Sequence, residues 1–359
     1  MRTINFPGQK DYPVYVGTQL SEKIANDLSS YEKIAIFAAA PLAGTAEMIS
    51  QKLSGKSMVA IRVLPDGELS KTVSQAAAAW DFLAEHRISR TDAVLAIGGG
   101  AITDMVNFVA ATWLRGVDVF LMPTTVLAMV DAAIGGKCGI NTDRGKNLVG
   151  VFNDPSSVYC DTSLLATLDD RDFRAGFAEI AKCGFIADPE IIENILNHDN
   201  EFWDFAHEVF LDCLYRAIAV KAQVVAEDPF EKSENGVGRA ALNYGHTLGH
   251  AIEKHSNFSW RHGDAVAVGM MFAAELAHQI GMLSQDVVLQ HRQVLTKLQL
   301  PASFSDGSLA ELMPIMSLDK KVQGSDIRFV LLADLAKPIF VVNPANDSLA
   351  AAYDKVSEE

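Results

Sequence analysis

Short runs rich in valine and isoleucine alternate with helix-type stretches over the first 160 residues. The runs are residues 12–17, 33–38, 58–64, 92–97 and 117–122, and the periodic stretch 70–86 lies between two of them. Strands that alternate with helices build βαβ units around a mostly parallel sheet. The alternation therefore predicts an α/β domain over residues 1–162.

The character of the chain changes after Thr162. Long segments with helical periodicity follow, at residues 171–186, 208–227, 239–255, 264–280 and 285–298. A β-hairpin pattern at residues 327–342 is the one interruption. We therefore expect a second, mostly helical domain over residues 163–359.

Composition and charge narrow the class of protein. With 359 residues, 49% of them hydrophobic, the chain can bury two cores. A net charge of −15 argues against general nucleic-acid binding, which needs a basic surface. The four cysteines form no C-x-x-C pair, the N-terminus lacks a signal-peptide pattern, and apolar runs stop short of a membrane span. These features predict a cytoplasmic protein that binds neither nucleic acid nor membrane.

Residues 239–264 contain His246, His250, His255 and His262. On a helix the first two would lie on one face, one turn apart, and Gly245 and Gly249 beside them suggest a close approach of another element. Thr247 stands where the zinc-protease pattern H-E-x-x-H needs glutamate. The histidines could be metal ligands or ordinary core and surface residues, and a third ligand must come from elsewhere.

Two loops of the first domain have compositions that suit a nucleotide. The sequence G-G-G-A-I-T-D follows the strand that ends at Ile97 and opens a helix, where backbone N–H groups favour an anion. The loop L-P-D-G-E-L-S-K carries Asp66, Glu68 and Lys71. Each loop could equally be a turn that binds nothing.

Several charged residues lie in apolar or glycine-rich surroundings. Lys137 and Lys146 flank glycine turns and could neutralise a small polyanion, or could be solvated. Glu179 lies three residues before Lys182 in an apolar helix. It could form an intrahelical ion pair with Lys182, or it could be the missing metal ligand. Lys221 lies in another apolar helix. It either extends its ammonium to solvent or belongs to the functional site.

Taken in order, the motifs of the chain resemble the sugar-phosphate cyclases, in particular the dehydroquinate synthase family. They are L-P-D-G-E, G-G-G-x-x-x-D, R-G-V, P-T-T, V-D-x-x-x-G-G-K, G-K-N-L-V-G, A-E-x-x-K, L-N-x-G-H-T-x-G-H-A-I-E, H-G-x-A-V-A-x-G-M and D-K-K. The resemblance implies a Rossmann-like NAD-binding domain, an all-α domain with one divalent metal ion, zinc or cobalt, and a homodimer.

The resemblance also assigns residues. Glu179, His246 and His262 match the metal ligands of the family, and Arg115 matches an arginine that reaches the neighbouring subunit's phosphate site. Positions for the substrate's carboxylate, hydroxyls and phosphate match Asp131, Lys137, Lys146, Asn147, Lys182, Lys221, Arg239, Asn243, His250 and Lys320. NAD positions match Asp66, Gly67, Glu68, Lys71, Gly99, Gly100, Asp104, Thr124, Thr125, Lys137, Lys146, Leu164 and Thr167.

Three residues depart from the pattern of the family. Ala39 stands where relatives have an acidic or amide residue near the adenosine ribose, and Thr103 stands where many have glycine. His255 matches no site position, and we expect it to be an exposed residue at a helix end. Of the adjacent pair Lys320 and Lys321, we assign the first to the substrate.

The resemblance implies conversion of 3-deoxy-D-arabino-heptulosonate 7-phosphate to 3-dehydroquinate and phosphate. The reaction combines transient oxidation by NAD, phosphate elimination, re-reduction and an intramolecular aldol step. Related alternatives are an aminodehydroquinate or 2-deoxy-scyllo-inosose synthase, or a metal-dependent polyol dehydrogenase. A non-enzymatic binding module would leave the Glu179, His246 and His262 set unexplained.

Overall fold

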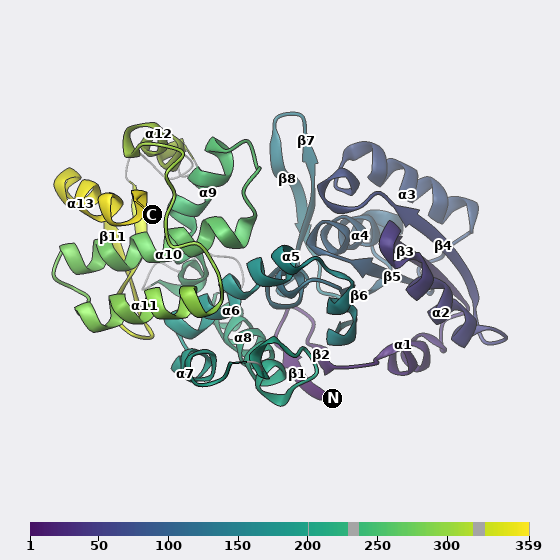
Figure 1. The fold of residues 1–359 in the computed structure, drawn as a ribbon. Coiled ribbons are helices and arrows are strands. Elements are labelled where there is room, and N and C mark those ends of the chain that lie inside the picture. Colours follow the sequence, from purple (N-terminus) through teal and green to yellow (C-terminus); the bar gives the residue numbers. More distant parts are fainter. Residues whose placement is uncertain (200, 229–236, 319–326, 359) are drawn as a thin grey trace. The chain divides into compact units, whose positions relative to one another are not determined.

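The computed structural model describes residues 1–199, 201–228, 237–318 and 327–358, which form two compact units (Figure 1). The first comprises Met1–Leu168 and Phe205–Ala222, and the second comprises Asp169–Asp204 and Gln223–Glu359. The helix α8 (Glu208–Glu227) runs from the first into the second. The domain boundary near Thr162 stays a prediction.

A seven-stranded sheet is the centre of the first unit, with the order β1-β2-β9-β6-β5-β3-β4. All neighbouring pairs are parallel except β1 and β2. The strands are β1 (Arg2–Phe6), β2 (Tyr12–Gly17), β3 (Lys33–Ala39), β4 (Met58–Leu64), β5 (Ala93–Gly98), β6 (Asp118–Pro123) and β9 (Ser157–Asp161). Every strand predicted for this domain is present, which confirms the α/β fold; β1 and β9 were not predicted.

Helices cover the two faces of this sheet. They are α1 (Ser21–Leu28), α2 (Ala43–Leu53), α3 (Val73–Glu85) and α4 (Gly100–Thr112). Right-handed crossovers place α1 and α2, which contact each other, on one face, and α3 and α4, also in contact, on the other. The chain reverses direction across the sheet between β3 and β5, and the carboxyl ends of strands at such a reversal are where open α/β sheets bind their ligands.

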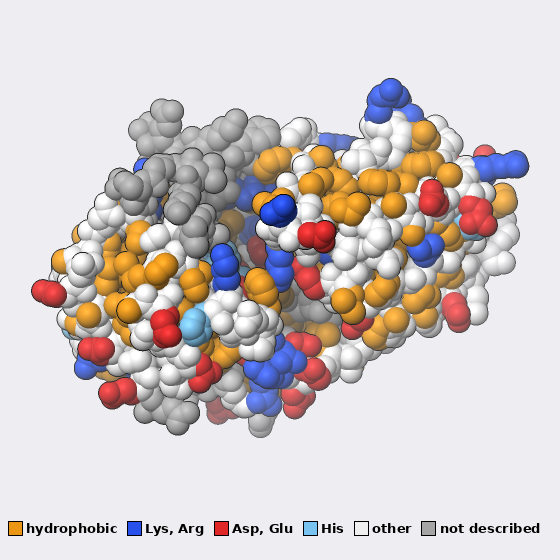
Figure 2. All heavy atoms as spheres, turned by 90° about the horizontal axis from the view of Figure 1, so that it is seen from above, with side chains coloured by type: hydrophobic (Ala, Val, Ile, Leu, Met, Phe, Trp, Pro, Cys, Tyr) orange, Lys and Arg blue, Asp and Glu red, His pale blue; other side chains and the backbone are white. Residues whose placement is uncertain are grey.

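A separate antiparallel hairpin, β7 (Lys137–Thr142) and β8 (Gly145–Phe152), extends the first unit. Its strands approach each other closely at the paired glycines Gly139 and Gly150. A Cβ on Gly139 would lie 2.6 Å from the Val149 carbonyl oxygen. Leu148 and Phe152 of β8 are exposed. Figure 2 shows further hydrophobic side chains gathered on the surface of this unit.

Short helical turns connect the elements of the first unit. They are η1 (Ala40–Leu42), η2 (Gly67–Ser70), η3 (Trp113–Arg115), η4 (Ala128–Ala132, a π-helix) and η5 (Thr162–Thr167).

The second unit is organised around α10 (His262–Gln279), which is buried along most of its length. It packs against α6 (Phe177–Ile186), α9 (His246–His255), α11 (Gln285–Lys297), α13 (Asn346–Ser357) and strand β10 (Arg328–Asp334). The remaining elements are α5 (Asp170–Ala175), α7 (Pro189–Asn197), η6 (Glu201–Trp203), η7 (Gly238–Asn243), α12 (Leu309–Leu318) and β11 (Lys337–Val342). The predicted helical fold and the β10–β11 hairpin are confirmed.

Two predicted helices are interrupted. The stretch 171–186 divides at Gly176 into α5 and α6. The stretch 239–255 consists of η7 and α9, because Gly245 between them is left-handed, with φ of 80°, and a left-handed residue cannot continue a right-handed helix. Among the described helices, none is long and apolar enough to cross a membrane.

Candidate functional site

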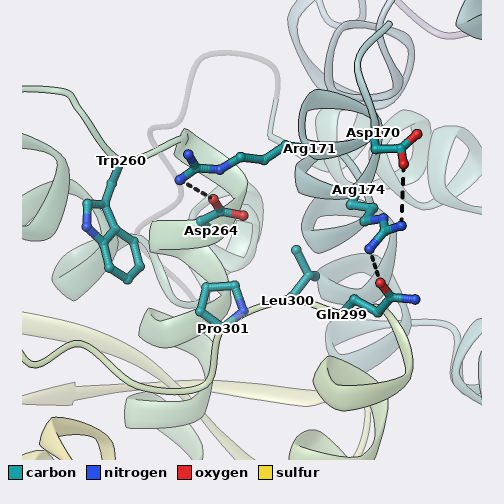
Figure 3. Close-up of a pocket in the computed structure, with 8 residues that line it drawn as sticks. All are labelled: Asp170, Arg171, Arg174, Trp260, Asp264, Gln299, Leu300 and Pro301. Atoms are coloured by element: carbon teal, nitrogen blue, oxygen red, sulfur yellow. Dashed lines mark hydrogen bonds and ion pairs between the residues drawn. The ribbon is translucent and has the colours of Figure 1, made fainter. Parts of the chain in front are cut away.

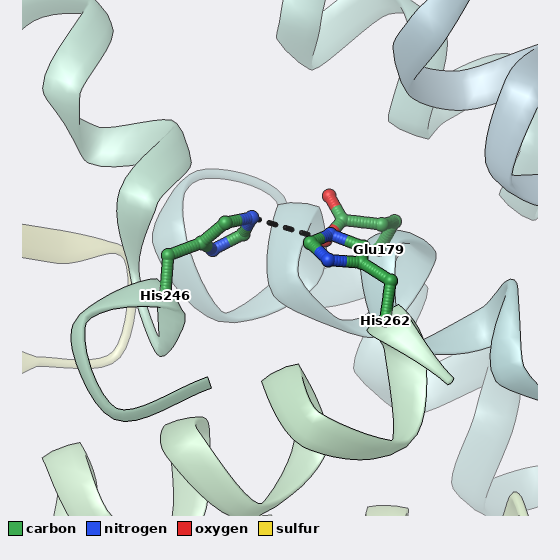
Figure 4. Close-up of side chains that lie close together, drawn as sticks. All are labelled: Glu179, His246 and His262. Atoms are coloured by element: carbon green, nitrogen blue, oxygen red, sulfur yellow. Dashed lines mark ion pairs between the residues drawn. The ribbon is translucent and has the colours of Figure 1, made fainter. Parts of the chain in front are cut away.

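Three side chains from three helices converge in the second unit (Figure 4). Glu179 lies on α6, and His246 and His262 are the first residues of α9 and α10. The Glu179 Oε1 atom is 3.5 Å from His246 Nε2 and 3.7 Å from His262 Nε2. The possible ligand atoms of this trio lie within 4.8 Å of one another.

Hydrogen bonds at the opposite ring nitrogens orient both imidazoles. His246 Nδ1 is 3.1 Å from the Tyr244 carbonyl oxygen, and His262 Nδ1 is 3.0 Å from Glu253 Oε2. A carbonyl or carboxylate oxygen can only accept, so both Nδ1 atoms carry protons. The Nε2 atoms are therefore the ones that could donate a lone pair to a metal ion.

Glu179 is an ionised carboxylate in a buried place, with a relative exposure of 2%. Its Oε2 accepts a hydrogen bond from Lys182, whereas Oε1 accepts none from the described residues. Burial opposes ionisation, but the Lys182 ammonium and the two imidazoles hold the pKa of Glu179 well below its usual range. A buried carboxylate oxygen without a partner is expected where a cation binds.

The two histidines differ in protonation. Burial lowers the pKa of His246 to about 3, so its ring is neutral at neutral pH. Burial acts in the same direction on His262, but the nearby Glu179 carboxylate and the hydrogen bond to Glu253 outweigh burial and raise its pKa to about 10. A cation that binds the trio would therefore displace the His262 Nε2 proton.

The donor set fits a divalent transition metal ion. Two imidazole nitrogens and one carboxylate oxygen are ligands typical of zinc and cobalt. A set of three protein ligands also leaves a coordination position open for water or substrate, as in catalytic zinc sites.

Other candidate residues of the second unit lie near this trio. The ring centroid of His250, one turn after His246 on α9, lies 5.2 Å from that of His246 and 6.0 Å from that of His262. Arg239 and Asn243 belong to η7, which leads into α9, and Arg239 is buried. His255 is only partly exposed, and its Nε2 lies 3.1 Å from the Asp306 carbonyl oxygen. Lys320 lies outside the described residues.

Ten of the thirteen NAD candidates follow the carboxyl ends of four parallel strands of the first unit, whereas Asp104 lies on α4 and Lys137 and Lys146 lie on the hairpin. Asp66, Gly67, Glu68 and Lys71 follow β4, Gly99 and Gly100 follow β5, Thr124 and Thr125 follow β6, and Leu164 and Thr167 follow β9. Ala39 is the last residue of β3. Carboxyl ends of parallel strands meet at one edge, where open α/β sheets bind their ligands.

The two glycines after β5 begin α4 where neighbouring chain segments approach closely. A Cβ on Gly100 would lie 2.9 Å from that of Ala132, and one on Gly99 would lie 3.2 Å from Thr125 Cγ2. Thr103, the departure noted above, is buried, and its hydroxyl donates to the Gly100 carbonyl at 3.0 Å. The N-terminus of α4 can thus offer backbone N–H groups to a phosphate.

Charged candidates of the first unit form pairs. Lys71 Nζ lies 2.5 Å from Asp104 Oδ2, and Lys146 Nζ lies 3.6 Å from Glu68 Oε1. Lys221 donates to both the side chain and the backbone carbonyl of Asp131. Burial raises the pKa of Asp104 to about 6, although Lys71 opposes this shift.

Two substrate candidates of the first unit, Lys137 and Asn147, lie on the hairpin of β7 and β8. Lys137 begins β7 and is exposed, and Asn147 lies in β8 with φ of 55°. The Asn147 backbone N–H donates to the Asn141 side-chain oxygen at 3.0 Å. Both residues therefore lie on the hairpin and not in the strand-end loops of the main sheet.

Arg115 is the candidate that lies apart from this edge. It follows the C-terminal end of α4, roughly 20 Å along the helix from the glycine loop at 1.5 Å per residue. Leu114 and Arg115 have φ of 49° and 67°, which is a strained conformation for residues with side chains. The turn therefore places Arg115 at the opposite end of α4 from the glycine loop.

A pocket that the sequence did not indicate lies in the second unit, with a volume of about 530 Å³ (Figure 3). Arg171 at its wall pairs with Asp264 at 3.4 Å, and Arg174 pairs with Asp170 at 3.7 Å. Trp260 and Pro301 supply apolar surface. The described residues that line it include none of the predicted site residues, and their charges are already balanced.

Comparisons with known proteins agree with this arrangement. Residues 61–175 match the model described as "3-dehydroquinate synthase N-terminal", and residues 176–322 match "3-dehydroquinate synthase C-terminal". A 3-dehydroquinate synthase of Nocardia farcinica is 45% identical, over 97% of this chain and 94% of its own length.

Two solved structures have the same fold. A 2-epi-5-epi-valiolone synthase from Streptomyces hygroscopicus, with NAD+ and Zn2+ bound, has a TM-score of 0.87 at 24% identity. A 2-deoxy-scyllo-inosose synthase, in complex with carbaglucose-6-phosphate, NAD+ and Co2+, has a TM-score of 0.83 at 23% identity. Each match covers 99% of both chains.

Proposed function

Because the chain belongs to the 3-dehydroquinate synthase family, we propose that it converts 3-deoxy-D-arabino-heptulosonate 7-phosphate to 3-dehydroquinate and inorganic phosphate. The chain is a carbon–oxygen lyase that acts on a phosphorylated substrate, in the shikimate pathway to aromatic amino acids. The observation that carries this conclusion is the match of both family models, together with relatives aligned over nearly the full length.

Each unit would hold one cofactor: NAD at the strand-end loops of the first, and one divalent ion, zinc or cobalt, between Glu179, His246 and His262. When bound, NAD supplies a reversible hydride acceptor and the metal ion polarises the alcohol oxygen that is oxidised. Glu179 contributes to this site a negative charge and an oxygen that accepts no hydrogen bond from the described residues.

The other residues of the site would bind and orient an anionic substrate. A chain of net charge −15 needs local positive charge for this purpose. Lys182 and Arg239 supply it in the second unit, and Lys137 supplies it in the first. Asn147, Asn243 and His250 would position hydroxyls. Asp131 holds the Lys221 ammonium in place, and Lys71 does the same for the buried Asp104 carboxylate. This is catalysis by orientation and charge placement.

We further propose a cytoplasmic homodimer in which Arg115 serves the partner subunit's phosphate pocket. The strained turn and the position of Arg115 at the far end of α4 support an action outside its own NAD edge. Exposed apolar side chains on the first unit, Leu148 and Phe152 among them, offer area that a second subunit could bury.

Release of inorganic phosphate tests the reaction. Purified enzyme with NAD and a divalent metal ion should release phosphate from the heptulosonate phosphate without steady accumulation of NADH, and EDTA should abolish release. No release would contradict the proposal. Release only from the amino analogue or from glucose 6-phosphate would assign a sibling cyclase, and steady NADH formation with a polyol would assign a dehydrogenase.

A further inference from the structure

Glu253 lies on the same face of α9 as two residues already assigned. It follows His246 by seven positions and His250 by three, and these spacings return to one side of a helix. Its side chain is 14% exposed. Glu253 has no role in the sequence analysis beyond its place in the motif G-H-A-I-E.

The contact of Glu253 is with the ring nitrogen of His262 that faces away from Glu179. The Nδ1 proton of His262 is donated to Glu253 Oε2 over 3.0 Å, which leaves Nε2 directed at Glu179. His246 has a neutral backbone carbonyl in the equivalent place. The two histidines of the trio are thus oriented by acceptors of different charge.

A second group of possible ligands shares His262. His250, Glu253 and His262 also have ligand atoms within 4.8 Å of one another. Two observations favour the trio with Glu179 as the metal site. Glu253 Oε2 is occupied by the His262 proton, and Glu179 is the more buried carboxylate, with an oxygen that accepts no hydrogen bond from the described residues.

We propose that Glu253 is a positioning residue for the metal site, one that fixes the ring of His262 with Nε2 toward Glu179 and makes that nitrogen a stronger donor. A carboxylate that accepts the second N–H of a metal-bound imidazole sets its tautomer and raises its basicity. α9 therefore supplies one ligand directly and orients the other. This inference rests on the metal site of the proposed function, but not on the identity of the substrate.

Metal affinity tests the inference, measured as the dissociation constants for Zn2+ and Co2+ in competition with a chromophoric chelator. Glu253→Ala should weaken binding about 10- to 100-fold, while circular dichroism shows a folded chain. Glu253→Gln should restore part of the loss, because an amide oxygen can still accept the Nδ1 proton. The matched control is Glu275→Gln on α10, a buried carboxylate that pairs with Arg292 at 3.5 Å and should bind metal as the wild type does.

Two outcomes would overturn the inference. One is wild-type metal affinity in Glu253→Ala. The other is loss of the bound ion in Glu253→Ala together with its retention in His246→Ala, which would make Glu253 a ligand in the second group. Phosphate release is measured separately from metal affinity. If the enzyme releases no phosphate from the heptulosonate phosphate but still needs Glu253 for tight metal binding, only the proposed reaction is refuted.

Discussion

Replacement of Lys182 by methionine tests how the charge of Glu179 is balanced. Both side chains are 2% exposed, and methionine keeps most of the length of lysine but not its charge. Removal of one partner of a buried ion pair costs about 3 to 5 kcal/mol, because the other charge is left uncompensated. We expect Lys182→Met to lower the free energy of unfolding in EDTA by up to that amount, since the charged His262 ring still faces Glu179.

A divalent ion should reverse much of this loss, since it supplies a new positive charge beside Glu179. Ligand at a hundred times its dissociation constant stabilises the folded state by about 2.7 kcal/mol, and removal of the nearby ammonium should tighten metal binding. Metal should therefore stabilise Lys182→Met more than the wild type.

The assay is urea unfolding followed by circular dichroism, in EDTA and in excess Zn2+. Lys297→Met is the matched control, because Lys297 pairs with Asp199, whose side chain is 84% exposed, and exposed ion pairs contribute little to stability. Equal losses of stability for the two variants in EDTA would show that Lys182 does not balance the buried charge of Glu179.

Three further predictions address packing, pH and assembly. Gly269→Ala should destabilise the fold and weaken metal binding, because its Cβ would lie 1.9 Å from the Gly245 carbonyl oxygen beside His246. Gly44→Ala is the control and should do neither, since the space around Gly44 is open. Equal effects of the two variants in thermal melts and metal titration would contradict this prediction. Burial lowers the pKa of His291 to about 4, below the unfolded value of about 6.5, so its neutral form contributes stability above pH 6.5 that is lost as pH falls toward 4. His291→Phe should therefore lose less stability than the wild type over that range, and an unchanged slope in unfolding curves would argue against it. Mixing Arg115→Ala with Lys137→Ala subunits should recover about a quarter of wild-type activity, since half the dimers are mixed and each holds one intact site. No recovery in verified heterodimers would place Arg115 in its own subunit's site.

The centre of the parallel sheet could be predicted because its inner strands β3, β5 and β6 are buried on both faces. Every residue of β5 is buried, and such strands read as continuous apolar runs. The hairpin of β7 and β8 was missed for the opposite reason. Nearly all of β8 is exposed. The glycines let the two strands approach closely, but in the sequence they are typical of turns.

The candidate metal trio could be reached only in part from the residues themselves. The spacing of His246 and His250 and the apolar setting of Glu179 nominated metal ligands, but the resemblance to a family was needed to choose His262 over His250. The groups that orient the rings gave little signal. Tyr244 contributes a backbone carbonyl, which no side-chain pattern reveals, and Glu253 depends on a fold that brings α10 beside α9.

The number of metal ions per chain shows whether Glu179, His246 and His262 form the metal site. Wild-type protein and His246→Ala, loaded with Zn2+ and freed of excess by dialysis, can be compared by elemental analysis, with circular dichroism to verify the fold. We expect one ion per wild-type chain and none in a folded His246→Ala variant. A folded His246→Ala variant that retains one ion per chain would contradict it.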